Sequence, residues 1–204
     1  MPKQAVDSRY VLLVIDMLED FFEPPSALAD SRARLVARTN ELVRAFRRRR
    51  HPVVWVRQEF RADLRDAFLA MRRQQRHVTI AGTKGAEILA ELERAESDPV
   101  VVKKRYSAFF GTPLESMLET WRPETLVVSG VNTHACVRTT VIDAYQRDYD
   151  VVVAADAVAS YDREHHDVTT RYLSGGIARF LVNAEILEML DQGVPADGAS
   201  GSRR

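Results

Sequence analysis

The sequence contains a single cysteine among its 204 residues, so it can form no internal disulfide. Its apolar runs are short, and none approaches the roughly 20 residues that a membrane-spanning helix needs. An excess of one charge is also missing, because 29 Lys and Arg residues balance 29 Asp and Glu residues. The N-terminal segment MPKQAVDSRY has no apolar stretch of the signal-peptide type. These absences predict a cytoplasmic protein that binds neither nucleic acid nor membranes.

What is present indicates an ordinary globular domain, with 46% apolar and 28% charged residues. Short apolar runs alternate with segments of helical periodicity along the whole body of the chain. This alternation predicts one α/β domain of three layers, built on a parallel sheet. We place the domain at residues 8–192, and the tail GVPADGASGSRR at residues 193–204 has the composition of a disordered segment. The strands are expected at residues 10–15, 53–56, 100–102, 126–130, 151–155 and 177–182, with helices expected between them, among others at residues 26–50, 62–73 and 87–92.

The stretch LVVSGVNTHAC, residues 126–136, carries the strongest chemical signal. A buried strand ends at Gly130, a polar turn follows, and Cys136 stands at the head of an amphipathic helix. The unpaired N–H groups and the positive dipole end of a helix start favour a thiolate over a thiol. Cys136 is therefore a candidate nucleophile, although a lone cysteine is more often a small buried hydrophobe.

Two further candidates follow expected strands. Asp16 comes directly after residues 10–15, where the alternative is an ordinary turn or helix-cap aspartate. Lys103 and Lys104 follow residues 100–102, and such a pair is commonly solvated. Because parallel strands bring their carboxyl ends to one edge of the sheet, we expect Asp16, Lys103 and Cys136 to converge there.

A carboxylate, an ammonium and a thiol at one place form a nucleophilic site. Asp16 would accept the thiol proton and later deliver it to the leaving nitrogen. Lys103 would hold Asp16 electrostatically and lower the pKa of the Cys136 thiol. The backbone N–H groups of Asn132 and Cys136 would bind the oxyanion. This arrangement predicts hydrolysis of an amide through a thioester.

Three segments in this order resemble the motifs of the isochorismatase-like cysteine hydrolases: VLLVIDMLEDFF around Asp16, VVKKRYSAFFGTPLESML around Lys103, and LVVSGVNTHACVRTTVIDAYQ around Cys136. The resemblance spans roughly residues 10–190. It implies a six-stranded, mostly parallel sheet with helices on both faces, the three residues as the catalytic triad, and a cis peptide bond at Val131–Asn132. It also implies a small-molecule substrate and assembly as a homo-oligomer.

Departures from the family patterns narrow the expected activity. Nicotinamidases of this family carry an Asp-x-His metal motif with a further His, whereas residues 57–60 read RQEF here. True isochorismatases lack the cysteine nucleophile. What remains resembles the metal-free branch that includes N-carbamoylsarcosine amidase and ureidoacrylate amidohydrolase. We therefore expect a cofactor-free and metal-free enzyme that cleaves the C–N bond of a small amide or ureide.

The substrate contacts are predicted only from proximity to these motifs. The irregular segment 57–85 is a candidate lid. If the substrate is a carboxylate, an arginine of residues 57–61 would clamp it. Two alternatives stay open, namely a related hydrolase of a secondary-metabolite amide or lactam, and a non-enzymatic binding protein that keeps the fold. The candidate pocket residues are Arg57, Glu59, Arg61, Tyr106, Phe109 and His134.

Overall fold

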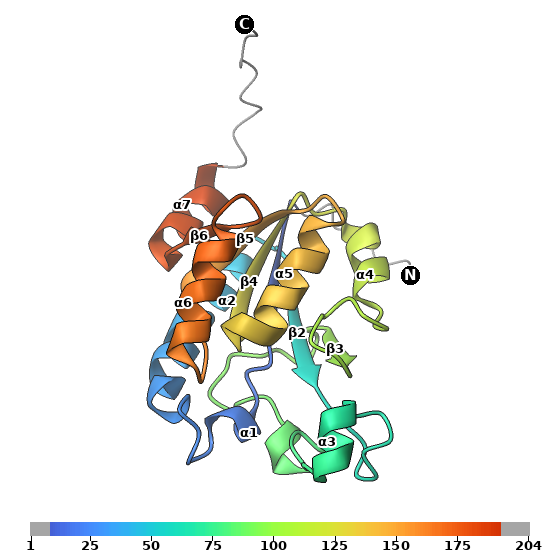
Figure 1. Ribbon diagram of the computed structural model, residues 1–204. Coiled ribbons are helices and arrows are strands. Elements are labelled where there is room, and N and C mark those ends of the chain that lie inside the picture. Colours follow the sequence, from blue (N-terminus) through green and yellow to red (C-terminus); the bar gives the residue numbers. More distant parts are fainter. Residues whose placement is uncertain (1–8, 193–204) are drawn as a thin grey trace, which may run out of the picture.

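The computed structural model of the protein describes residues 9–192 (Figure 1). The first residue of the expected domain and the expected tail at residues 193–204 lie outside this range. Within it, six strands form one sheet in the order β3-β2-β1-β4-β5-β6, and every neighbouring pair is parallel. The strands are β1 (Tyr10–Ile15), β2 (Val53–Gln58), β3 (Val100–Lys103), β4 (Thr125–Val131), β5 (Asp150–Ala159) and β6 (Arg179–Leu181). The expected α/β fold with a six-stranded sheet is confirmed.

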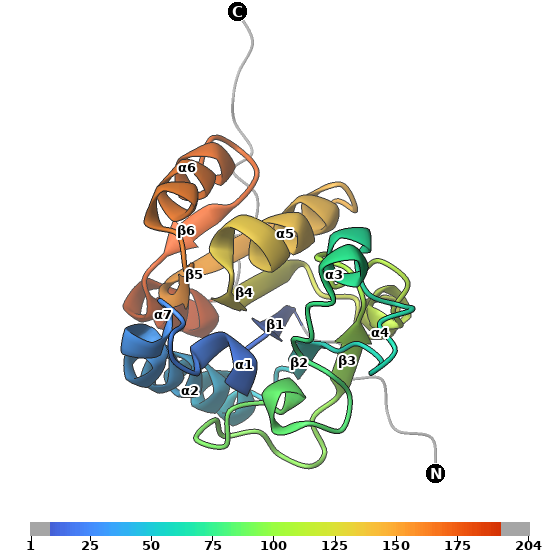
Figure 2. The same cartoon turned by 60° about the horizontal axis from the view of Figure 1, so that its bottom comes forward.

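Helices cover both faces of the sheet, which gives the three layers (Figure 2). α4 (Leu114–Trp121), α5 (Arg138–Tyr145) and α6 (Arg163–Leu173) lie on one face, and α2 (Arg32–Arg48) and α7 (Asn183–Gln192) lie on the other. Near the carboxyl ends of the strands lie α1 (Glu19–Phe22) and α3 (Leu69–Gln74). Short 3-10 turns occupy Ala29–Ser31 and Lys84–Ala86, and a π-helical turn occupies Thr133–Val137. No helix within residues 9–192 has both the length and the apolarity to cross a bilayer.

The central strand β1 shows why the core forms as it does. All six of its residues are buried, and they alternate between the two hydrophobic clusters. Leu12 and Val14 pack toward α2 and α7, whereas Leu13 and Ile15 pack toward α4 and α5. Each such burial contributes about 1.5–3 kcal/mol, so a continuous apolar run is what a strand covered on both faces requires.

The chain order creates a crevice at the carboxyl edge of the sheet. From β1 the chain proceeds outward through β2 and β3, and then returns to place β4 on the other side of β1. This reversal between β1 and β4 is a topological switch point, which is where open α/β sheets bind ligands.

Gly130 allows β4 to approach β1 closely at this point. Its φ is +110°, and a Cβ placed there would lie 1.9 Å from the carbonyl oxygen of Ile15. Only glycine fits this position without moving the backbone.

Two expected helices are wrong in extent or absent. In the segment 62–73 the helix begins only at Leu69, because Asp63 accepts the backbone N–H of Arg65 and Leu64 adopts a φ of +56°. The segment 87–92 is not helical. Instead, Ile88 forms an antiparallel β-bridge with Leu18. The backbone of this segment therefore lies beside the residues that follow β1.

Candidate active site

The structure brings the three predicted catalytic side chains together at the carboxyl edge of the sheet. Asp16 follows β1, Lys103 ends β3, and Cys136 lies in the π-helical turn between β4 and α5. The Nζ of Lys103 lies 2.7 Å from Oδ2 of Asp16 and 3.2 Å from Sγ of Cys136. Asp16 and Lys103 are fully buried, and Cys136 is 4% exposed. The convergence expected from the parallel topology is therefore present.

Backbone groups of β2 hold Asp16 in position. The residue adopts a φ of +52°, which turns the chain sharply after β1, and its N–H donates to the carbonyl oxygen of Val56. The N–H of Gln58 donates to Oδ1 of Asp16 at 2.7 Å. Oδ2 of Asp16 lies within ion-pair distance of the Lys103 ammonium. It accepts no hydrogen bond of good geometry from residues 9–192. Oδ2 thus keeps a lone pair available to a further donor.

Lys103 reaches the centre of the sheet from the edge strand. It is the register partner of Gln58 on β2, and its long side chain extends past β2 to contact Asp16, which follows β1. Its Nζ also donates to the carbonyl oxygen of Arg105 at 3.2 Å. Burial by itself lowers the pKa of the Lys103 ammonium, but the negative charge of Asp16 and the contact with Cys136 outweigh burial and raise that pKa overall. The site therefore favours the charged form of Lys103.

The expectation of a lowered cysteine pKa is wrong. Burial raises the pKa of the Cys136 thiol well above its ordinary value, and the negative charge of Asp16 raises it further. Lys103 acts in the expected direction but does not compensate for these two effects. Both effects favour the neutral thiol of Cys136 beside the buried ion pair, since a second negative charge next to Asp16 is unfavourable.

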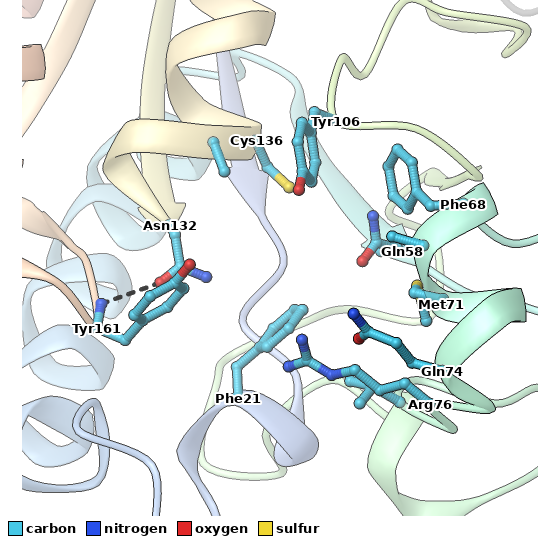
Figure 3. A pocket seen from close by; sticks show the side chains of 13 residues that line it. Phe21, Gln58, Phe68, Met71, Gln74, Arg76, Tyr106, Asn132, Cys136 and Tyr161 are labelled. Atoms are coloured by element: carbon cyan, nitrogen blue, oxygen red, sulfur yellow. Dashed lines mark hydrogen bonds between the residues drawn. The ribbon is translucent and has the colours of Figure 1, made fainter. Parts of the chain in front are cut away.

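A cavity of about 270 Å³ opens at Cys136 (Figure 3). Its size lies just below the usual range for small-molecule sites, about 300–1,000 Å³. Asn132 and Tyr161 form one side, where the backbone N–H of Tyr161 donates to Oδ1 of Asn132. The remaining lining residues are Phe21, Gln58, Phe68, Ala70, Met71, Gln74, Arg76, Val78, Tyr106 and Ala135.

The turn that carries Cys136 begins at Asn132, which is 7% exposed. The peptide bond Val131–Asn132 is cis, as the family resemblance implies. The carbonyl oxygen of Asn132 accepts the N–H groups of Ala135 and Val137, which closes the turn around Cys136. Asn132 and Cys136 both border the cavity, so their predicted role as backbone donors to an oxyanion stays compatible with the site geometry.

Of the six predicted pocket residues, only Tyr106 lines this cavity. Arg57 pairs with Glu59 at 2.7 Å and borders a different depression, because neighbouring residues of β2 point to opposite faces. Phe109 is 4% exposed and belongs to the core, where the guanidinium of Arg147 covers its ring.

The other two corrections concern charged or polar surface residues. Arg61 pairs with Asp63 on the surface at 2.9 Å. His134 contacts Ser160 at 2.5 Å and the hydroxyl of Tyr161 at 3.3 Å. It therefore packs against Tyr161, which lines the cavity, but does not line the cavity itself.

The sequence reasoning missed Gln58, Arg76, Phe21 and Tyr161. Gln58 had a usable signal, because it lies one residue from Arg57 on a strand and thus on the opposite face. The segment 57–85, expected as a lid, also contributes Phe68, which precedes α3, and Met71 and other wall residues of α3. Within residues 9–192 no group of three or more His, Cys, Asp or Glu side chains is arranged to hold a metal ion.

Comparison with known proteins extends over the same region. The isochorismatase domain model matches residues 10–185. A probable inactive nicotinamidase from Arabidopsis thaliana is 38% identical over 162 residues, which cover 76% of this chain and 83% of that protein. An isochorismatase family protein from Desulfovibrio vulgaris has a TM-score of 0.79 and 31% identity, covering 91% of this chain and 97% of that one. The N-carbamoylsarcosine amidase of Thermoplasma acidophilum has a TM-score of 0.71 and 28% identity, covering 85% and 96%.

Proposed function

The chain belongs to the isochorismatase family, and from this membership we propose that it is a cysteine hydrolase that cleaves a C–N bond of a small amide or ureide. One observation carries the proposal. A fully buried carboxylate pairs with a fully buried ammonium, and this ammonium contacts the only thiol of the chain beside a cavity of about 270 Å³. A protein that only binds ligands has no physical need for such a trio, which is costly to bury.

In the proposed mechanism Asp16 takes the thiol proton as Sγ of Cys136 attacks the carbonyl carbon. The carbonyl oxygen becomes an oxyanion, which the backbone N–H groups of Asn132 and Cys136 would stabilise. As the intermediate collapses, the C–N bond breaks and Asp16 returns its proton to the leaving nitrogen. A thioester remains on Cys136.

The second half of the reaction repeats these roles with water. Asp16 removes a proton from a water molecule as its oxygen attacks the thioester carbon. The carbon–sulfur bond then breaks, and the proton on Asp16 returns to Sγ of Cys136. Lys103 keeps its charge throughout, which agrees with the direction in which its pKa is shifted. Its role is to stabilise whichever of Asp16 and Cys136 carries the negative charge.

The test is ammonia release from N-carbamoyl amino acids, ureidoacrylate, biuret and nicotinamide, with wild type compared with Cys136→Ala. Turnover that disappears in Cys136→Ala would support the proposal, and a chelator arm would show whether a metal contributes. Turnover retained by Cys136→Ala would contradict the mechanism.

A second candidate, a binding protein that keeps the fold, is favoured by one observation. The Arabidopsis relative is described as probably inactive. This candidate predicts saturable binding of an amide, with no ammonia release by either wild type or Asp16→Asn. A cytoplasmic location remains a prediction from the sequence, and homo-oligomeric assembly remains a prediction from the family resemblance.

A further inference from the structure

The turn that carries Cys136 is held by the segment that follows β5. Three consecutive residues at the start of the turn each contact this segment through a side chain. The pairs are Asn132 with Tyr161, Thr133 with His166, and His134 with Ser160. In the first pair, Oδ1 of Asn132 accepts the backbone N–H of Tyr161 at 3.1 Å (Figure 3). The segment 160–166 therefore fixes the backbone that leads into Cys136.

Thr133 is the most buried of the three turn residues. It is fully buried, and its Oγ1 lies 2.9 Å from Nδ1 of His166, which projects from the start of α6 and is half-buried. Burial lowers the pKa of the His166 ring, which favours the neutral imidazole at pH 7. A neutral imidazole has one donor and one acceptor nitrogen, and a hydroxyl can donate or accept. The bond between Thr133 and His166 therefore forms with either tautomer of the ring.

The start of α6 gives His166 a fixed place. Asp162 is the N-cap, whose Oδ1 accepts the N–H of His165 at 2.8 Å and whose carbonyl oxygen accepts the N–H of His166 at 3.0 Å. Oγ of Ser160, which contacts His134, also accepts the N–H of Asp162 at 3.3 Å. The helix start and the turn thus share a hydrogen-bonding partner, so the position of one defines that of the other.

The position of this turn matters because of its backbone N–H groups. An oxyanion hole works only if its donors lie about 2.7–3.1 Å from the position that the oxyanion will take. Thr133 directly follows Asn132 and precedes Cys136 by three residues, so it lies between the two proposed donors. A displacement of about 1 Å can lower a rate about a hundredfold.

We propose that His166 is a positioning residue that, through Thr133, holds the backbone N–H groups of Asn132 and Cys136 toward the cavity. This inference rests on the proposed hydrolase for the role of these two donors, and it names what keeps them in place.

Two reagents separate a positioning role from a structural one. When 4-nitrophenyl acetate acetylates Cys136, Sγ bonds to the carbonyl carbon, an oxyanion forms, the C–O bond breaks, and 4-nitrophenol leaves with the thiol proton. In alkylation by iodoacetamide, Sγ displaces iodide from a saturated carbon, so no oxyanion forms. The ratio of the acetylation rate to the alkylation rate therefore reports on the oxyanion donors. Changes in thiol exposure affect both reactions, and Cys136→Ala provides the blank for acetylation of other residues.

His166→Ala and Thr133→Val should each lower this ratio about tenfold, because either change removes the bond between the two side chains. Since both act through one bond, the double variant should show about the same loss as each single variant. His166→Asn should keep most of the wild-type ratio, because an amide atom of Asn lies as many bonds from Cβ as Nδ1 of His does. In amide hydrolysis, Thr133→Val should lower kcat with little change in KM, because the oxyanion forms only after the substrate has bound.

Thr125→Val is the matched control. Thr125 is 1% exposed, stands at the opposite end of β4, and its Oγ1 donates to Oδ2 of Asp150 at 3.0 Å. The control therefore also removes a side-chain hydrogen bond of a buried threonine, but far from the turn. It should leave the ratio unchanged.

An unchanged ratio in folded Thr133→Val would overturn the inference, as would an equal fall in Thr125→Val or a hundredfold fall in the double variant. A wild type that iodoacetamide alkylates but 4-nitrophenyl acetate does not acetylate would also overturn it, since the two donors then form no oxyanion hole. If the ratio falls as expected but wild type releases no ammonia from any amide, the positioning role stands and the hydrolase proposal alone fails.

Discussion

Replacing Asp16 by Asn should make Cys136 more reactive toward an alkylating agent while sharply lowering turnover. The pKa of the Cys136 thiol is raised by burial and then by the negative charge of Asp16. The Asp16–Lys103 and Lys103–Cys136 contacts, 2.7 Å and 3.2 Å, share one nitrogen, so Oδ2 and Sγ are at most about 5.9 Å apart. At an effective dielectric constant of about 20, unit charges at this distance repel by roughly 2.8 kcal/mol.

Removing this repulsion corresponds to roughly a hundredfold more thiolate at neutral pH. A thiolate of lower basicity is intrinsically less nucleophilic, with a slope of about 0.4–0.5 on a logarithmic scale, so the net gain is about tenfold. Lys103 remains as the counter-ion of the new thiolate. The acid–base group is lost, however, so turnover should fall by a factor of about 10²–10⁴.

The assay is the rate of iodoacetamide modification at pH 7, followed by intact-protein mass spectrometry. The chain has one cysteine, so every adduct reports on Cys136. Asp63→Asn is the control, because Asp63 is an ion-paired surface carboxylate outside the site. If folded Asp16→Asn reacts no faster than wild type, the electrostatic account of the resting thiol is wrong.

Three further predictions concern stability. Lys103→Met should destabilise the protein by about 3–5 kcal/mol in urea unfolding, because it leaves the buried carboxylate of Asp16 unpaired. Adding Asp16→Asn should recover part of this loss. A double variant no more stable than Lys103→Met would contradict this reasoning. Gly130→Ala should lower stability by much more than Gly82→Ala, since both have positive φ but a Cβ meets nothing within 4 Å at Gly82; similar midpoints for the two would refute the close approach of β1 and β4. The pKa values of three histidines are lowered mainly by burial, so the unfolded chain binds protons at these histidines more readily than the folded protein does. Stability should therefore fall as the pH drops below about 6.5. Urea unfolding between pH 8 and pH 5.5 measures this trend, and a stability that does not change with pH would contradict it. These histidines are His51, His134 and His166.

The parts of the fold that the sequence predicts are those in which local pattern and tertiary environment agree. β1 is a continuous apolar run because both of its faces are covered, so pattern and burial coincide. The segment 87–92 has helical spacing, yet the N–H of Leu89 donates to the carbonyl oxygen of Met17. A partner 72 residues away in the chain thus overrides the local preference, and no local signal reveals it.

The same distinction applies to the site. Asp16, Lys103 and Cys136 were predictable because parallel strands place their carboxyl ends at one edge, whatever the loops do. The pocket wall was not, because nearness in sequence says little about which side of a strand faces the cavity. Arg57 and Gln58 are adjacent, and only Gln58 lines the cavity. The direction of the Cys136 pKa was also inaccessible, since it depends on burial and on Asp16 more than on the start of a helix.

In the proposed mechanism the raised pKa of Cys136 is compatible with a nucleophilic role, because the proton transfer to Asp16 would occur inside a trio of fixed net charge. In the resting site Lys103 is paired with the Asp16 carboxylate, at 2.7 Å. When the proton moves, Asp16 becomes neutral and the negative charge appears on Sγ, which is 3.2 Å from the same ammonium. No new charge is created in the buried site, so the large cost of ionising an isolated thiol there does not apply. The repulsion that favours the neutral thiol at rest would disappear in the proposed activation step, and the transferred proton would stay on Asp16, from which the leaving nitrogen can receive it.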